Sequence, residues 1–306
     1  MRLRKHPRML STRSPTFKHG TVKSTENALI GDLTLLSMQG PDAEAFAQSQ
    51  TMNDVQGLAV GQWHWNGWLN AKGRVLALFA LARPAPGELL LVVLDESALA
   101  LRDGLQRFVF RSKVRLVVRD DLGAFAEAAE APGPLQARDR CIQEADGGLV
   151  LDLSTEHGAR RLRIAARGDH AIDAEATRRW RETDLRHGLP RWAAGREHAW
   201  TPHMLSLDRL KAFSTRKGCY PGQEIVARTH FLGQSKRQAW WLDGVGLATG
   251  QVLSDAEGRS IGEVVEATTD GRGALAVAAL PAAGPVGGVH GPALASPPLT
   301  GLARPA

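Results

Sequence analysis

The sequence predicts an α+β fold in which two α+β units are followed by a small antiparallel β-barrel. Three observations predict this arrangement. Residues 27–119 combine short apolar strands with two helical segments, residues 149–186 add strands and then a helix, and the chain after Gly233 consists of short strands separated by turn residues. No repeat of fixed period is visible, which excludes solenoids and propellers.

The first unit, predicted over residues 24–118, is built around a β-hairpin. Polar and apolar residues alternate from residue 62, and an apolar strand follows over residues 74–81. The sequence Asn-Ala-Lys-Gly between these strands is typical of a tight turn. Pro41, followed by acidic residues, predicts the start of a helix. A second helix is expected over residues 96–110.

The second unit, predicted over residues 119–234, has strands at 149–153 and 160–166 and a helix over 172–186. Gly188 and Pro190 end that helix, because glycine favours a helix terminus and proline forbids continuation.

A barrel is predicted over residues 235–282, where Asp-Gly and Glu-Gly turns separate three short strands. Residues 283–306 are rich in proline and glycine and are expected to form a loose tail.

The basic charge of the chain is confined to its first residues. The net charge is +6, and residues 1–23 carry seven basic and no acidic residues, so residues 24–306 sum to −1. We interpret residues 1–23 as a disordered tail or a misplaced start, with a transit-like or RNA-contacting arm as the alternative. A neutral body argues against recognition of phosphates, so no direct nucleic-acid partner is expected.

Hydropathy and cysteine content exclude several further classes. No apolar stretch of ~18 residues is present, so neither a membrane-spanning helix nor a membrane partner is expected. Two cysteines form neither a disulfide framework nor a four-cysteine metal site. A reducing, cytoplasmic location and no resident metal are the resulting expectations, with Cys141 in the core.

The segment from Thr215 to Arg228 carries the most unusual chemistry in the chain. Cys219 precedes a Pro-Gly turn and the predicted start of a helix, and basic residues flank it on both sides. Cations and a helix N-terminus favour a thiolate over a thiol. A single cysteine is nevertheless more often a small buried apolar residue. From the residues alone, a structural thiol and a functional one both stay open.

This segment resembles the signature of the YgfZ family, the folate-binding relatives of the glycine-cleavage T-protein. The matching residues read Lys217-Gly218-Cys219-Tyr220-x-Gly222-Gln223-Glu224. The resemblance extends over about residues 27–280 and includes Gly40-Pro41-Asp42, the turn from Asn70 to Arg74, Gly188-Leu189-Pro190 and residues 229–237. It implies a T-protein-like fold, with two entangled α+β domains around a central channel and a C-terminal antiparallel β-barrel.

The resemblance also implies a function. A member of this family would bind tetrahydrofolate in the channel and support iron–sulfur cluster assembly or repair, including in tRNA-modifying enzymes. The expected partners are folate and iron–sulfur client enzymes or cluster-assembly proteins.

The family motif implies a role for each matching residue. Cys219 would be the reactive thiolate and Lys217 would keep it ionised. Gln223 and Glu224 would fix the turn or bind a ligand, Arg228 would face the glutamate tail of folate, and Tyr220 would stack on the pterin.

Three residues outside the motif complete the predicted site. The hairpin turn with Asn70 and Lys72 is expected near the channel, with a solvated turn as the alternative. Trp65 could stack on a flat ligand, although core packing with Trp63 is the more common role of such a pair.

Two departures from the T-protein pattern bear on catalysis. That family has a carboxylate shortly after the glycine that corresponds to Gly73, whereas residues 74–79 here contain none. Aminomethyl transfer needs a group that orients and deprotonates the folate amine, so a tetrahydrofolate-dependent aminomethyl or one-carbon transferase is the alternative function and not the leading one. A glutamate that precedes the Gly-x-Pro corner in these relatives is also absent.

Any iron–sulfur cluster would need thiolates from a partner, because two cysteines cannot supply four.

Overall fold

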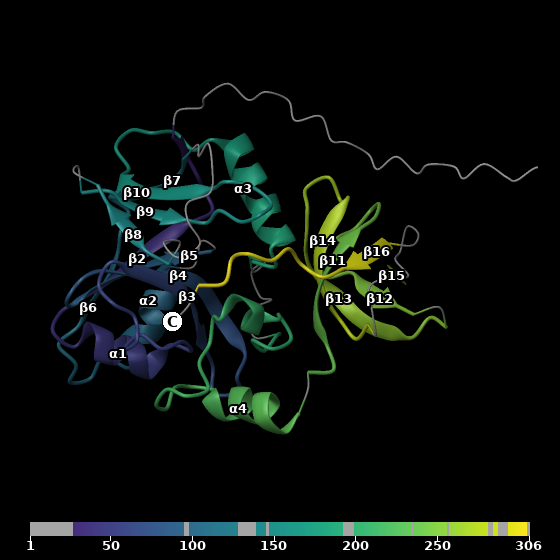
Figure 1. Ribbon diagram of the computed structural model, residues 1–306, viewed down its shortest axis with the longest axis horizontal. Helices are drawn as coiled ribbons and strands as arrows, with labels where there is room; N and C mark the ends of the chain where they lie inside the picture. The colour runs from purple at the N-terminus through teal and green to yellow at the C-terminus, as the bar shows by residue number, and fades with distance from the viewer. Residues whose placement is uncertain are drawn as a thin grey trace, which may run out of the picture.

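The computed structural model describes residues 27–94, 98–127, 139–144, 147–191, 199–233, 235–255, 257–280, 284–286 and 293–304. These residues form three antiparallel sheets with few helices, so the predicted α+β class is confirmed (Figure 1). The predicted basic tail, residues 1–23, lies outside the described residues.

The first sheet has the strand order β3-β4-β5-β2-β6. Its strands are β2 (Thr34–Gln39), β3 (Gln62–Leu69), β4 (Val75–Ala85), β5 (Glu88–Val93) and β6 (Arg115–Val118). Helices α1 (Ala43–Gln50) and α2 (Ala98–Gln106) pack with one face of this sheet in a common apolar core. The opposite face belongs to a larger core shared with the second sheet.

The second sheet has the order β1-β7-β10-β9-β8. Its strands are β1 (Ala28–Leu29), β7 (Leu122–Glu127), β8 (Cys141–Gln143), β9 (Leu149–Asp152) and β10 (Arg161–Ala166). Strand β1 precedes the whole first sheet in the chain, yet it pairs with β7. The two units are therefore entangled, as expected.

Helix α3 (Ala174–Arg186) follows the second sheet and ends where the sequence predicts. The side chain of Asp173 accepts a hydrogen bond from the backbone N–H of Ala176 at 2.8 Å and caps the helix start. Gly188 adopts φ +65° just beyond the helix end, a conformation that favours glycine.

The third sheet is a curled antiparallel half-barrel with the order β12-β13-β14-β11-β16-β15 (Figure 1). Its strands are β11 (Gln238–Asp243), β12 (Val252–Ser254), β13 (Ser260–Ala267), β14 (Gly273–Ala278), β15 (Gly284–Val286) and β16 (Ala293–Ser296). Register shifts between β12 and β13 and between β13 and β14 help the sheet to curl.

The prediction of a loose tail after residue 282 is wrong for the described part of that segment. Strand β16 pairs with β11 and β15, and its residues Ala293 and Ala295 are buried on one face. Buried and exposed residues alternate over only four positions in β16, and the surrounding prolines and glycines made this strand hard to identify from the sequence.

The last residues return from the third sheet to the first two (Figure 1). Leu302 is buried in the large core, and its carbonyl oxygen accepts a hydrogen bond from Nε1 of Trp65 at 2.8 Å. Nη2 of Arg304 donates to the carbonyl oxygen of Asp152 at 2.6 Å, and its guanidinium lies 4.9 Å from the ring centroid of Trp63. Residues 297–304 thus connect the half-barrel to the α+β units through buried contacts and hydrogen bonds. Among the described residues, the helices are all too short or too polar to cross a membrane.

Replacing Leu302 with alanine should lower the free energy of unfolding by about 2–4 kcal/mol, because it leaves a cavity in the shared core. Urea denaturation followed by circular dichroism measures this change. Leu294→Ala is the matched control, since Leu294 is 58% exposed in β16 and its truncation should cost little. Equal midpoints for the Leu302 and Leu294 variants would contradict the assigned role of the C-terminal segment.

Candidate functional site

Cys219 lies in an exposed turn that leads into helix α4 (Gln223–Leu232), which projects at the lower end of the molecule in Figure 1. Gly222 precedes the helix and adopts φ +78°. The side-chain Nε2 of Gln223 donates to the carbonyl oxygen of Lys217 at 3.1 Å, which closes the turn around the cysteine. The sequence left open whether Cys219 is a buried structural residue or an accessible thiol. The structure shows that its side chain is exposed.

Lys217 holds this turn against the first α+β unit. Its buried Nζ donates to the backbone carbonyl oxygens of Thr51, at 2.6 Å, and Asn53, at 2.8 Å. Thr51 is the C-cap residue of helix α1, so an ammonium here also faces the negative end of the helix dipole. Burial lowers the pKa of Lys217 to about 7, while nearby Asp54 opposes that shift. The structure thus gives Lys217 an anchoring role, and its effect on the ionisation of Cys219 stays a prediction.

Tyr220 and Trp65 belong to the core. The hydroxyl of Tyr220 donates to the carbonyl oxygen of Ser214 at 3.1 Å, and Nζ of Lys217 lies 5.0 Å from the ring centroid. Burial raises the pKa of Tyr220. Trp65 is equally buried and packs edge-to-face with Trp63 at a centroid distance of 5.4 Å. The predicted stacking of a ligand on Tyr220 is therefore corrected, because its ring is buried. Of the two roles considered for Trp65, the structure shows core packing with Trp63.

The predicted turn between β3 and β4 is confirmed. The side-chain Oδ1 of Asn70 accepts hydrogen bonds from the backbone N–H groups of Lys72, at 2.9 Å, and Arg74, at 3.0 Å. Gly73 adopts φ +66° within this turn. Asn70 therefore shapes the backbone, and the side chain of Lys72 is exposed at the tip.

This hairpin tip touches the Cys219 turn. A Cβ atom at Gly222 would lie 2.5 Å from the carbonyl oxygen of Asn70 and 2.7 Å from Cα of Gly73. A Cβ atom at Gly73 would lie 2.8 Å from Cβ of Ile225 in α4. Two motifs that are far apart in the sequence thus meet through a contact that only glycine allows on both sides.

A buried polar network behind Lys217 was missed by the sequence analysis. Nδ2 of Asn66 donates to Oγ1 of Thr51 at 3.0 Å and lies 3.3 Å from Nε2 of His64. Oδ1 of Asn66 accepts from the backbone N–H of Asn53 at 2.9 Å. Burial, and then the charge of Lys217, lowers the pKa of His64 to about 3, so this imidazole is neutral at pH 7.

The signal for this network was present in β3. His64 and Asn66 alternate with tryptophans, and such a polar face is normally interpreted as exposed to solvent. Both faces of β3 are buried in this fold, so these polar side chains must find partners inside.

The remaining predicted residues lie on the surface near the turn. Glu224 is exposed in the first turn of α4, and Arg228 is exposed one turn later. The structure therefore brings Asn70 and Lys72 to the Cys219 turn and places Arg228 on the helix that follows it. An arginine and a lysine of this kind are suited to bind a carboxylate or phosphate.

Cys141 is buried, and burial raises the pKa of its thiol to about 11. Within the part of the chain that the structure describes, no group of three or more His, Cys, Asp or Glu side chains is placed to hold a metal ion. Cys219 is therefore the accessible thiol of the two.

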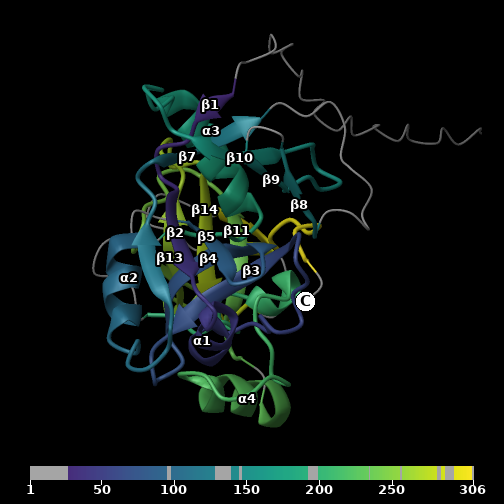
Figure 2. The same ribbon diagram turned by 90° about the vertical axis from the view of Figure 1, so that its left-hand side faces the viewer.

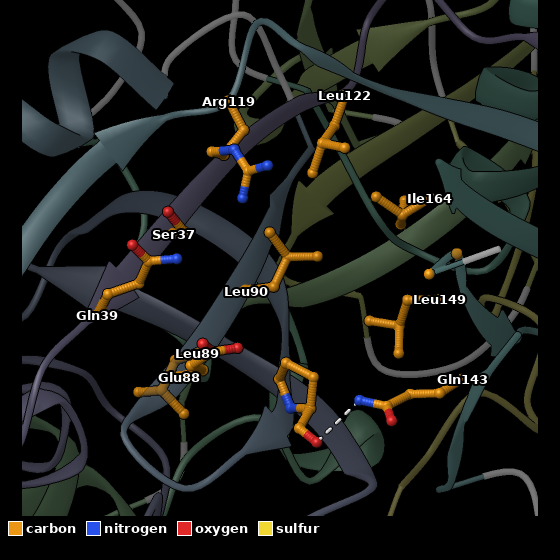
Figure 3. Close-up of a pocket in the computed structure, with 13 residues that line it drawn as sticks. Ser37, Gln39, Glu88, Leu89, Leu90, Arg119, Leu122, Gln143, Leu149 and Ile164 are labelled. Carbon is orange, nitrogen blue, oxygen red and sulfur yellow. Dashed lines mark hydrogen bonds between the residues drawn. The ribbon is translucent and has the colours of Figure 1, made fainter. Parts of the chain in front are cut away.

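Two cavities lie elsewhere in the fold, and no residue from Lys217 to Gly222 lines either of them. One, of about 230 Å³, lies where the first and second sheets face each other, with Ser37 and Gln39 on one wall and Leu149 and Ile164 on the other (Figure 3). No residue of the Cys219 turn lines it. The other, of about 520 Å³, lies between α4 and the third sheet and is lined by Thr229 and other residues, including His203, Arg209, His230, Trp240 and Pro298.

Gly222→Ala should destabilise the protein by about 2 kcal/mol or more, because alanine disfavours positive φ and its methyl group would meet the hairpin backbone. Chemical denaturation measures the loss. Gly218→Ala is the control within the same motif, since a Cβ atom there has no neighbour within 4 Å. Similar stability of the two variants would show that the hairpin contact does not constrain the turn.

The lowered pKa of Lys217 predicts a pH dependence of stability. The pKa of lysine is about 10.4 in an unfolded chain and about 7 here, so between these values the unfolded state binds more protons. The free energy of unfolding should therefore rise with pH above 7, by at most ~1.4 kcal/mol per pH unit from this group. Comparing Lys217→Met with the unmodified chain from pH 7 to 9 isolates the contribution. If the free energy of unfolding changed with pH in the same way in both proteins, the predicted contribution of Lys217 would be refuted.

The chain is similar to known proteins in sequence and in fold. No protein-family model matches the chain. A tRNA-modifying protein YgfZ of Vibrio vulnificus is 30% identical over 235 residues, which cover 71% of this chain and 69% of the relative. The protein of the same name in Klebsiella pneumoniae is 28% identical over 246 residues, covering 74% of each chain.

Among solved structures, the glycine cleavage system aminomethyltransferase T of Bartonella henselae superposes with a TM-score of 0.66, covering 88% of this chain and 83% of that one. At 18% identity, this likeness shows that the fold is T-protein-like. The extent and identity of the sequence matches show that the chain belongs to the YgfZ family.

Proposed function

We propose that this chain is a cytoplasmic, folate-binding accessory factor that supports iron–sulfur cluster assembly or repair in client enzymes, including tRNA-modifying ones, and that it acts through Cys219. The observation that carries the proposal is an exposed thiol on a turn fixed from two sides. Lys217 anchors the turn to the carbonyl groups of Thr51 and Asn53, and Gly222 packs on the hairpin. A group held in this way reacts or coordinates without first having to be ordered.

The cluster is the cargo in this proposal. Cys219 supplies one thiolate, and the buried Cys141 has a thiol pKa of about 11, which disfavours the thiolate that iron needs. The other cluster ligands must therefore come from a client enzyme, an assembly protein or a small thiol. An accessible turn suits such sharing, because a second protein can approach the sulfur.

Folate fits the surface residues better than the buried ones. Arg228 is exposed on α4 and forms no ion pair with another described residue, so it can bind a carboxylate of the glutamate tail. The cavity beside α4, at about 520 Å³, is within the usual size range of ligand pockets, and its lining includes Thr229 and His230 but not Arg228. Neither Tyr220 nor Trp65 can hold the pterin, which must be bound by other residues. Tetrahydrofolate would supply a one-carbon carrier.

The alternative is a tetrahydrofolate-dependent aminomethyl or one-carbon transferase of the T-protein class. The shared fold favours it. Strand β4 argues against it, because its first residues, Val75 to Phe79, carry no carboxylate to accept a proton from the folate amine. Turnover of a methylamine donor with tetrahydrofolate would favour the transferase.

Calorimetry with tetrahydrofolate, paired with assays of cluster-dependent tRNA thiolation in cell extracts, tests both halves of the proposal. Cys219→Ala should bind folate like the unmodified chain and should fail to restore thiolation. Arg228→Gln should weaken folate binding about tenfold, as expected for loss of a charge-assisted hydrogen bond.

Two substitutions serve as controls. Arg259→Gln removes an exposed arginine from the third sheet, and Cys141→Ala removes the other thiol. Absence of folate binding by the unmodified chain would reject the folate half. Normal thiolation with Cys219→Ala would reject the cysteine half and leave the folate half standing.

A further inference from the structure

We propose that the surface between α2 and β6 binds a single-stranded segment of RNA. This surface, here called the basic–aromatic patch, consists of Arg107, Phe108, Phe110, Arg111, Lys113 and Arg115. It lies outside the Cys219 turn, and the proposal does not rest on folate binding. Helix α2, from which the patch continues, lies on the outside of the molecule, at the left in Figure 2.

Two aromatic rings of the patch are open to solvent. Phe110 is 87% exposed and Phe108 is 49% exposed. The guanidinium of Arg111 lies 5.5 Å from the ring centroid of Phe110, as in a cation–π pair. Exposed rings beside an arginine provide flat surfaces on which nucleobases can stack.

The charge of the patch is concentrated, with one carboxylate beside it: Oδ2 of Asp42 accepts a hydrogen bond from the backbone N–H of Lys113 at 2.6 Å. Arg107, Arg111, Lys113 and Arg115 are exposed, and no acidic residue occurs between residues 104 and 119. None of these four side chains forms an ion pair with another residue of the described ranges; Arg119, at the end of the segment, pairs with Asp121. The near-zero net charge of residues 24–306 conceals this local concentration. Our proposal therefore differs from the expectation, drawn from the net charge, that no nucleic acid is bound.

The chemistry of the patch favours RNA over other occupants. A second copy of the chain would bring like charges together, and two phenylalanines offer little apolar area for a protein interface. A phosphate backbone complements the four cations, and bases that are not paired can reach the rings. The single-stranded form is favoured because bases in a duplex are already stacked on one another.

The chain offers a second exposed aromatic residue as a control. Phe231, at the end of α4, is 66% exposed and lies on the helix that also carries the acidic Glu224. Arg259 on the third sheet is an exposed arginine with acidic neighbours, since it pairs with Asp255 and Glu257. The two controls match the patch in residue type and exposure but lie outside it.

Fluorescence anisotropy with a labelled twelve-nucleotide oligouridylate tests the proposal. The full-length chain is used with the seven basic residues of positions 1–23 replaced by glutamine, which removes binding by that tail. Phe110→Ala should weaken binding roughly tenfold, from loss of base stacking. Arg111→Gln should reduce the slope of log K against log salt concentration by about 0.7, the contribution of one phosphate contact to a single strand. Phe231→Ala and Arg259→Gln should leave affinity and slope unchanged.

Several outcomes would overturn the proposal. Loss of all binding when the tail is neutralised would assign the RNA contact to residues 1–23. Equal weakening by Phe231→Ala and Phe110→Ala would show that the patch has no special role. Equal affinity for oligouridylate and for polyglutamate would favour an acidic protein as the partner, and equal affinity for a duplex of the same length would exclude base stacking.

Discussion

The candidate site depends on the two hydrogen bonds that the buried side-chain amine of Lys217 donates to backbone carbonyl oxygens. Lys217 crosses from the second α+β unit to the end of α1 in the first, so the turn that carries Cys219 is fixed to both units at once. The polar network of Thr51, Asn53 and Asn66 supports the backbone that receives the amine. The glycine contact between Gly222 and the hairpin then fixes the other side of the turn.

These constraints separate the roles within one short motif. Lys217 and Tyr220 face inward and are structural, Gln223 closes the turn, and Cys219 faces outward. The motif therefore combines residues that position the turn with one residue, Cys219, that the turn exposes to solvent. Among the described residues, no group of three or more His, Cys, Asp or Glu side chains is placed to hold a metal ion, at this sulfur or elsewhere.

Local sequence signals predicted much of the fold and part of the site. The β3–β4 hairpin, the end of α3 and the start of α4 depend on turn and capping residues that act over a few positions, and all three are confirmed. The burial of Tyr220 could not be predicted, because the direction of its side chain depends on tertiary packing and not on the local sequence. The network around His64 was missed for the same reason, since a polar face is buried only when another layer covers it. Strand β16 was missed because its short alternation lies among prolines.

The pairing of β1 with β7, and the return of Leu302 and Arg304 to the first two sheets, have a consequence for biosynthesis. A ribosome releases the N-terminal strand long before its neighbour in the sheet exists, and the residues that close the shared core leave the exit tunnel among the last. The apolar surface of the segments that emerge early therefore stays uncovered until the later segments that pack on it have been made.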